Sequence, residues 1–250
     1  MRRWLILSFF LLASVGVTVW VTGMEKIGVM TPFTYEEIFL ETRVHLLDLV
    51  FPSVLIATVI AVLVGILITR TGFKRLGSPI MAVASAAMSI PSMGVLAIMV
   101  PILIALGFQL YSYGILPALV ALVTWGVLPI LRNTYAGINN ISPGILEAAR
   151  GMGMTRGQIA RRIELPLALP VIMAGIRITT VILVGTAALA VIVGAGGLGR
   201  IILAGVNNRV PLITLQGAAP VAAIAIVLST ILGYVERRLT PRGMRIETAF

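Results

Sequence analysis

The chain has 250 residues, of which 59% are hydrophobic and 11% are charged, and its formal net charge at pH 7 is +10. Soluble domains are about 45–50% apolar and about 25% charged, so this composition excludes a disordered chain and a soluble enzyme and indicates a polytopic membrane protein. The absence of cysteine and the single histidine, His45, exclude disulfides, a thiol nucleophile and a histidine metal cluster.

Six segments are apolar and long enough to cross a bilayer, which takes roughly 20 residues. In chain order they are 4–21, 46–69, 80–106, 115–131, 167–193 and 212–235. The third contains Pro91 and Pro101, which predict one broken or bent span, with two half-spans as the alternative. Continuous apolar runs favour helices over a transmembrane β-barrel. The predicted fold is an all-α polytopic membrane bundle of about six transmembrane helices.

Basic residues are distributed unevenly over the segments between these spans. If the N-terminus is cytoplasmic, 14 of the 19 Lys and Arg residues fall on cytoplasmic segments, 4 fall on outer segments, and Arg177 lies within a span. This asymmetry is typical of the positive-inside rule and predicts that both termini are cytoplasmic. Because the basic residues are scattered over membrane flanks, nucleic acid is not expected as a partner.

Residues 1–43 are predicted to form an N-terminal anchor followed by an outer loop. Val21-Thr22-Gly23 is a poor small-x-small cleavage site, so an uncleaved anchor is favoured over a signal peptide. Within the outer loop, residues 34–47 place Leu40, Val44 and Leu47 at helical spacing. This pattern predicts a short helix on the outer surface that leads into the second span.

The segment between the fourth and fifth spans, 132–166, is the sizeable polar stretch on the predicted cytoplasmic side. Ser142 followed by Pro143 predicts a helix start, with a hydroxyl cap and a proline at the first helical position. This helix is expected to stop near Gly151 and Gly153. Glycine at the second of these positions allows a sharp bend into the next helix.

A second helix in this segment is predicted to start at Thr155, with Gln158 three residues later forming a capping box. It is expected to end before Pro166, because the residue preceding a proline disfavours the helical region. The segment would then be two short helices around a glycine break. By itself such a loop could simply tether the two spans, so its function depends on the residues that it carries.

The pattern EAA, three residues, G, nine residues, I, one residue, LP occurs within this segment. It resembles the EAA loop of the permease subunits of binding-protein-dependent ABC importers. The resemblance implies a type I permease core of five helices over 44–236, one additional N-terminal helix and a cytoplasmic tail, 237–250. It also implies that 132–166 is a coupling loop that contacts the ATPase. The seven matching positions are Glu147, Ala148, Ala149, Gly153, Ile163, Leu165 and Pro166.

The stretches 132–138, 165–177 and 194–199 resemble the quaternary-amine branch of these permeases, which imports glycine betaine, carnitine and choline. Methionine-importer permeases share much of the pattern and remain the alternative. The resemblance implies an ABC ATPase, an extracytoplasmic solute-binding protein and a second permease chain, identical or paralogous, in a bacterial inner membrane. The chain has no GxxxxGK[ST] loop, so this subunit is predicted to be non-catalytic, with no cofactor and no metal.

Two features are candidates for the transport pathway. Arg177 lies within the fifth span, where charges are rare and often functional, so it is either a gate or pathway residue or the partner of a polar neighbour. Gly194, Gly196 and Gly199 satisfy G-x-G-x-x-G, but they follow an apolar helix and not a strand, which excludes a dinucleotide site. With Gly197, these glycines predict a flexible helix end near an outer gate.

Aromatic residues make up 6% of the chain, and no aromatic cage for a quaternary ammonium group is evident. We therefore expect a separate binding protein to supply selectivity and a low-affinity passage lined by small and hydroxyl residues, including Ser85, Ser89, Ser92, Thr124, Thr179, Thr180 and Thr186. The competing hypothesis is an ATP-independent secondary transporter. Such carriers usually place ionisable groups in mid-membrane, and this chain offers little beyond Arg177 and Asp48.

Overall fold

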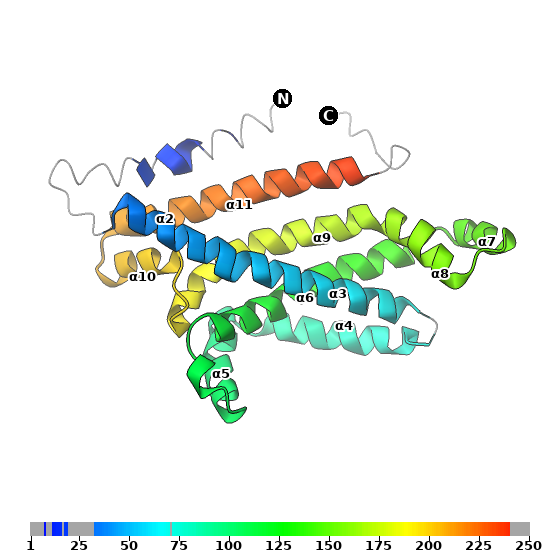
Figure 1. Cartoon of the computed structure of the whole chain (residues 1–250), viewed down its shortest axis with the longest axis horizontal. Helices are drawn as coiled ribbons and strands as arrows, with labels where there is room; N and C mark the ends of the chain where they lie inside the picture. Colours follow the sequence, from blue (N-terminus) through cyan, green and yellow to red (C-terminus); the bar gives the residue numbers. More distant parts are fainter. Residues whose placement is uncertain (1–7, 9–11, 17, 20–32, 71, 241–250) are drawn as a thin grey trace.

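The computed structural model describes residues 8, 12–16, 18–19, 33–70 and 72–240, and most of the predicted span 4–21 lies outside these residues. Every regular element assigned over 33–240 is a helix, which confirms the all-α prediction. Figure 1 shows the arrangement. The α-helices are α2 (Tyr35–Arg43), α3 (Phe51–Thr69), α4 (Lys74–Ser89), α5 (Ser92–Ala105), α6 (Ile115–Asn139), α7 (Pro143–Gly151), α8 (Arg156–Ile159), α9 (Leu165–Thr186), α10 (Gly199–Asn207) and α11 (Pro211–Leu239).

Four continuous helical stretches within the described residues are long and apolar enough to cross a membrane. They run side by side along the long axis of the molecule, with α2 and α10 at one end and α7 and α8 at the other (Figure 1). The pair α4 and α5 adds a fifth span if it is counted as one broken helix. The stretches are Tyr35–Thr69, Ile115–Asn139, Arg156–Val193 and Pro211–Leu239.

Two of these stretches continue through a proline by way of a π-helical segment. Val44–Val50 precedes Pro52, and Ala160–Glu164 precedes Pro166. Proline has no amide hydrogen and its ring crowds the carbonyl four residues earlier, whereas a π turn shifts hydrogen bonding by one residue. The prediction that the second loop helix ends before Pro166 is therefore wrong, since that helix continues into α9.

The outer helix predicted over 34–47 is likewise the first part of the continuous stretch Tyr35–Thr69. Thr34 caps it through a capping box with Glu37, which fixes where the helix begins. The face of this helix that packs inward carries Ile38, Glu41 and His45, which are all buried. It is not the apolar face that the sequence pattern predicts. Leu40 and Leu47 are more than half exposed, because they point away from the bundle. The helix also crosses the predicted boundary between residues 43 and 44.

The third predicted span is broken as expected. α4 and α5 meet at an angle of 100°. Ile90 and Pro91 between them have extended backbone conformations, with ψ of 130° and 136°, as expected for a residue preceding proline. Pro101 lies within α5 without ending it. The break at Pro91 therefore turns α5 away from the direction shared by the long helices (Figure 1).

Glycines allow α6 to pack closely between α3 and α9. A Cβ atom at Gly65 of α3 would lie 2.6 Å from Thr134 Cγ2 of α6, and a Cβ at Gly175 of α9 would lie 2.8 Å from Asn133 Cβ. Such small residues let membrane helices approach one another at short range. The packing fixes α6 as the centre of the bundle, with its C-terminal end directed at α7 and α8 (Figure 1).

Candidate functional site

The predicted loop 132–166 contains a helical hairpin made of α7 and α8, at one end of the bundle (Figure 1). It is shorter than the sequence predicts, because α6 extends to Asn139 and the helix that includes α9 starts at Arg156. Arg132 thus lies in α6, where its Nη2 donates a hydrogen bond to Ser85 Oγ at 2.8 Å. The hairpin therefore stands directly on the ends of two spans.

Local hydrogen bonds define the turn of the α7–α8 hairpin. Gly153 has φ of +77°, a conformation that glycine adopts readily and other residues adopt at a cost. The Gly153 amide donates to the Arg150 carbonyl at 2.9 Å, and the Met154 amide donates to the Ala149 carbonyl at 3.1 Å. The sharp turn predicted at Gly153 is present.

Of the two capping hydrogen bonds that the sequence predicts in the hairpin, one is present and the other is not. Thr155 and Gln158 form the predicted capping box, with both reciprocal hydrogen bonds present. Ser142 occupies the predicted N-cap position of α7, but its hydroxyl makes no capping hydrogen bond. The Ile145 amide instead donates to the Ser142 backbone carbonyl at 3.1 Å, which satisfies that donor.

The seven EAA-pattern residues separate into two groups. Glu147, Ala148 and Gly153 are exposed on the hairpin, while Ala149 is fully buried. The remaining three lie further along the chain, where the π-helical segment meets α9, and are half-buried or exposed: Ile163, Leu165 and Pro166. The hairpin therefore presents a small, exposed surface around Glu147, and the second group lies on the helix that connects it to the bundle.

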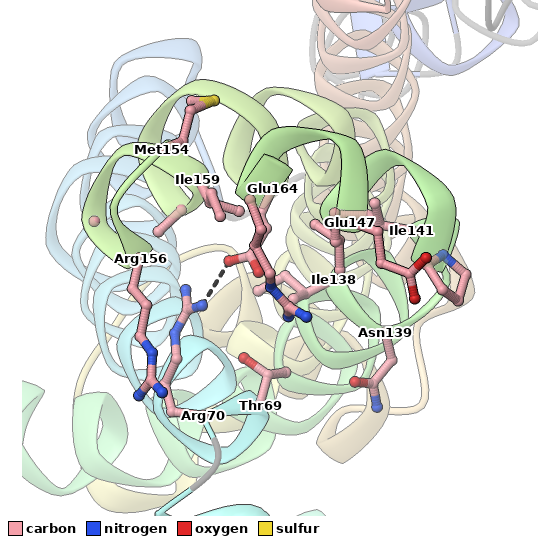
Figure 2. A pocket seen from close by; sticks show the side chains of 15 residues that line it. Thr69, Arg70, Ile138, Asn139, Ile141, Glu147, Met154, Arg156, Ile159 and Glu164 are labelled. Atoms are coloured by element: carbon pink, nitrogen blue, oxygen red, sulfur yellow. Dashed lines mark hydrogen bonds and ion pairs between the residues drawn. The ribbon is translucent and has the colours of Figure 1, made fainter. Parts of the chain in front are cut away.

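A cavity of about 1000 Å³ lies beside the hairpin, between α7, α8 and the ends of α3 and α6. Figure 2 shows Glu147, Asn139 and Thr69 on its walls. Across it, Arg70 Nη1 and Glu164 Oε2 form an ion pair at 2.6 Å, which the dashed line in Figure 2 marks. This ion pair joins the end of α3 to the helix that leads from the hairpin, a contact that the sequence pattern did not predict.

Arg177 has a polar neighbour in the bundle. Its Nη1 lies 3.4 Å from Glu236 Oε2 on α11, three residues before that helix ends at Leu239. Gly233, one turn earlier on α11, makes room for the guanidinium, since a Cβ there would lie 2.9 Å from Arg177 Nη1. The observed geometry is the ion-pair alternative that the sequence left open beside a gate or pathway role.

We expect Arg177→Leu to destabilise the protein by about 1 kcal/mol, because Glu236 loses its cationic partner. The effect is modest because the Arg177 side chain is 38% exposed and solvent screens the pair. Arg177→Leu combined with Glu236→Gln should recover the lost stability, measured as thermal unfolding in detergent. If the double variant unfolds like wild type yet no longer transports, Arg177 has a pathway role beyond the ion pair.

The glycine turn that the sequence predicts on the outer side, residues 194–199, connects the 3₁₀-helical segment Ala187–Val193 to α10. Gly194, Gly196 and Gly197 all have φ near +80°. Gly199 has no space for a side chain, because its Cβ would overlap the Ala188 carbonyl oxygen. The turn is tightly packed at Gly199, and its predicted flexibility stays a prediction. The sequence pattern missed α10 because its nine residues are too short for a span.

Polar side chains from the Tyr35–Thr69 helix hold this turn. Glu41 Oε1 and Arg200 Nε form an ion pair at 2.7 Å, and the Arg200 guanidinium also lies 5.5 Å from the centre of the Phe33 ring. His45 Nε2 donates to the Val184 carbonyl at 2.9 Å. A Cβ at Gly197 would press on the His45 ring at 3.2 Å. The glycines therefore let the turn lie directly against Glu41 and His45.

Two of the hydroxyls predicted to line a passage are instead buried in the helix packing. Thr179 and Thr180 are at most 3% exposed. Thr179 donates to the Gly126 carbonyl at 3.3 Å, and Thr180 donates within its own helix to the Ile176 carbonyl at 2.8 Å. Among the described residues, no group of three or more His, Cys, Asp or Glu side chains is placed to hold a metal ion.

The described helices form a membrane bundle that carries an exposed helical hairpin at one end. The chain belongs to the family of binding-protein-dependent transport system inner membrane components, which matches residues 61–242. It is therefore the permease subunit of a binding-protein-dependent ABC importer, and a multi-pass membrane protein.

Curated relatives and solved structures agree with this assignment. The choline transport system permease protein OpuBB of Bacillus subtilis (strain 168) is 40% identical over 77% of this chain and 84% of its own length. The osmoprotectant import permease protein OsmY of Salmonella typhimurium (strain LT2) is 36% identical over 96% of this chain and 97% of its own. An inward-facing structure of the MetNI methionine ABC transporter matches with a TM-score of 0.73 and 26% identity, over 85% of this chain and 100% of that one.

Proposed function

We propose that this permease subunit carries a quaternary-amine osmoprotectant, such as glycine betaine, choline or carnitine, into the cell. The observation that supports this substrate class is the 40% identity to a choline permease over most of the chain. Relatives whose names include glycine betaine and carnitine are 38% identical over a similar length. The 26% identity to the methionine transporter chain is lower, which favours the quaternary-amine class over the methionine alternative.

The α7–α8 hairpin is the element that would contact a separate ABC ATPase. Ala148 is exposed and small, so a partner surface can approach α7 closely, and Glu147 beside it offers a charge for pairing. Met152 is 73% exposed on the turn, and its flexible thioether suits an adaptable apolar contact. ATP hydrolysis belongs to the partner in this scheme, and the present subunit is non-catalytic.

The working importer would contain two permease chains, identical or paralogous, two ATPase subunits and an extracytoplasmic solute-binding protein. The distribution of Lys and Arg supports cytoplasmic termini in a bacterial inner membrane. In this arrangement, residues 1–43 serve as anchor and outer segment, 44–236 form the permease domain, and 237–250 are a cytoplasmic tail. The hairpin then faces the cytoplasm and the turn 194–199 faces outward.

The outer glycine turn, with Gly196, Gly197 and Gly199, is proposed to border the outer gate, because it lies at the opposite end of the bundle from the hairpin (Figure 1). Inside the bundle, Trp125 lines a small cavity with Ser92 and Thr186. A single indole is less than the aromatic cage that quaternary ammonium recognition usually requires. Selectivity is therefore assigned to the binding protein, and the permease offers a low-affinity passage.

Uptake by proteoliposomes that contain the complete importer tests this function. The complex is purified from native membranes, and labelled choline, glycine betaine, carnitine and methionine are supplied with the binding protein and internal or external ATP. We expect ATP-dependent uptake of at least one quaternary amine and none of methionine. Uptake of methionine alone would contradict the substrate class, and uptake driven by an ion gradient without ATP would favour a secondary transporter.

A further inference from the structure

Polar contacts join two long helices of the bundle near both of their ends. The stretches Tyr35–Thr69 and Arg156–Val193 run in opposite directions along the bundle. Near the hairpin, Arg70 Nη1 and Glu164 Oε2 are 2.6 Å apart. At the other end, His45 Nε2 is 2.9 Å from the Val184 carbonyl oxygen. Each helix therefore reaches from the hairpin end of the molecule to the outer glycine turn, and polar contacts join the pair at both places.

Near the hairpin, the Arg70–Glu164 pair is a polar link to α3, whereas further into the bundle Ala168 and Ile172 of α9 share one apolar cluster with Val62 and Ile66 of α3. The cavity of about 1000 Å³ separates α7 and α8 from the ends of α3 and α6, and surfaces that face a void have no contacts through which to push. Over the described residues, Arg70–Glu164 is the one ion pair between the stretch 156–164 and another span. Figure 2 shows this pair among the residues that line the cavity.

The ion pair is placed where it can be stronger than an ordinary surface pair. The Glu164 side chain is only 12% exposed, and a carboxylate that loses its partner in such a setting keeps its desolvation penalty. Arg70 is the C-cap residue that follows α3, with an extended backbone at ψ of 146°. Its guanidinium therefore reaches sideways from the helix end to Glu164 in the π-helical segment.

We propose that Arg70 and Glu164 are positioning residues that make these two helices move as one unit when the hairpin is displaced. The displacement is then delivered to both sides of the outer glycine turn, because α9 leads into it and Glu41 and His45 hold it. This inference rests on the proposed function, since the ATPase supplies the displacement. It assigns to the pair a role in coupling that is separate from the binding of the ATPase.

Charge reversal in the complete importer tests the pair. We expect Arg70→Glu and Glu164→Arg each to lower solute transported per ATP hydrolysed about fivefold, the size of a typical coupling between paired residues. The exchange variant, which carries both changes, should restore the ratio of solute transported to ATP hydrolysed to within about twofold of wild type. Arg75→Glu is the matched control, because it makes the same charge change at an exposed position. Single variants that behave like the control, or an exchange variant that fails to recover, would overturn the proposal.

A distance measurement keeps the proposal testable if the reversals disturb folding. The chain has no cysteine, so spin labels can be placed specifically at Leu67→Cys on α3 and Arg162→Cys beside Glu164, both exposed positions. We expect the same label distance in nucleotide-free and ATP-trapped complexes. With the milder Arg70→Gln change added, the distance should differ between the two states. A distance that already differs without that change would refute the inference.

The two proposals fail in different ways. Absence of an ATPase from the complex of the unchanged chain would refute the proposed function, and with it this inference. An ATPase that stays bound to Arg70→Glu, with an unchanged ratio of transport to ATP hydrolysis, would refute the role of the ion pair alone.

Discussion

Replacing Gly153 by arginine is expected to uncouple transport from ATP hydrolysis while leaving the spans folded. The φ of +77° at this position costs a residue with a side chain about 1–2 kcal/mol, which lowers the population of the correct hairpin turn about fivefold to thirtyfold. The arginine side chain also enlarges the exposed surface that the ATPase would meet. Solute uptake and ATP hydrolysis by the purified complex measure the effect, and uptake should fall by at least about tenfold.

Gly151 supplies a matched control for the backbone part of this effect. A Cβ at either Gly151 or Gly153 meets nothing within 4 Å, but only Gly153 of the two has a positive φ. Gly151→Ala should therefore leave uptake unchanged, since alanine is favoured over glycine in a helix, whereas Gly153→Ala should reduce it. Normal uptake by Gly153→Arg would count strongly against the hairpin as the coupling element.

The Gly199→Ala change is expected to destabilise the protein more than Arg177→Leu does. The Cβ of an alanine at position 199 would overlap the carbonyl oxygen of Ala188. Because the positions of these two atoms are set by the backbone, a rotamer change cannot relieve the overlap. Overpacking usually costs about 1–3 kcal/mol, and we expect the upper end of this range here. Thermal unfolding in detergent should occur about 6–12 °C lower, from about 2–4 °C for each kcal/mol in a chain of this size.

Gly185→Ala is the control for Gly199→Ala. Gly185 lies in α9, where an added Cβ meets nothing within 4 Å, so the alanine variant should unfold at or slightly above the wild-type temperature. If Gly199→Ala and Gly185→Ala unfold at the same temperature, the turn at residues 194–199 is looser than the packing around Ala188 indicates. In that case the flexible turn that the sequence predicts would be the better description.

Local patterns predicted the features that depend on neighbouring residues. Composition and segment length gave the all-α membrane bundle, because a bilayer requires long apolar helices. The capping box at Thr155 and the sharp turn at Gly153 were predictable, since both depend on residues within one helical turn. The EAA spacing indicated the family before the fold was known. The roles of its seven residues stay predictions until the hairpin is tested.

The continuity and pairing of the helices could not be predicted in the same way. Pro166 favours a helix end, yet the π-helical segment before it lets the chain continue into α9. Leu40 and Leu47 form a regular apolar face, yet the bundle buries the face of Glu41 and His45. In a membrane protein, exposed apolar residues can face lipid, so hydrophobic periodicity does not identify the packed side.

The sequence by itself therefore determined that this protein is a helical permease, the approximate positions of the five predicted spans after residue 43, and the place where its hairpin turns. The permease family is indicated by the resemblance of the EAA spacing, whereas the spans and the turn follow from apolar length and from backbone preferences within a few residues. The tertiary structure alone decided that Arg70 meets Glu164, that Arg177 meets Glu236 and that Glu41 meets Arg200. Such partners lie far apart along the chain, and the packing of the helices brings them within reach.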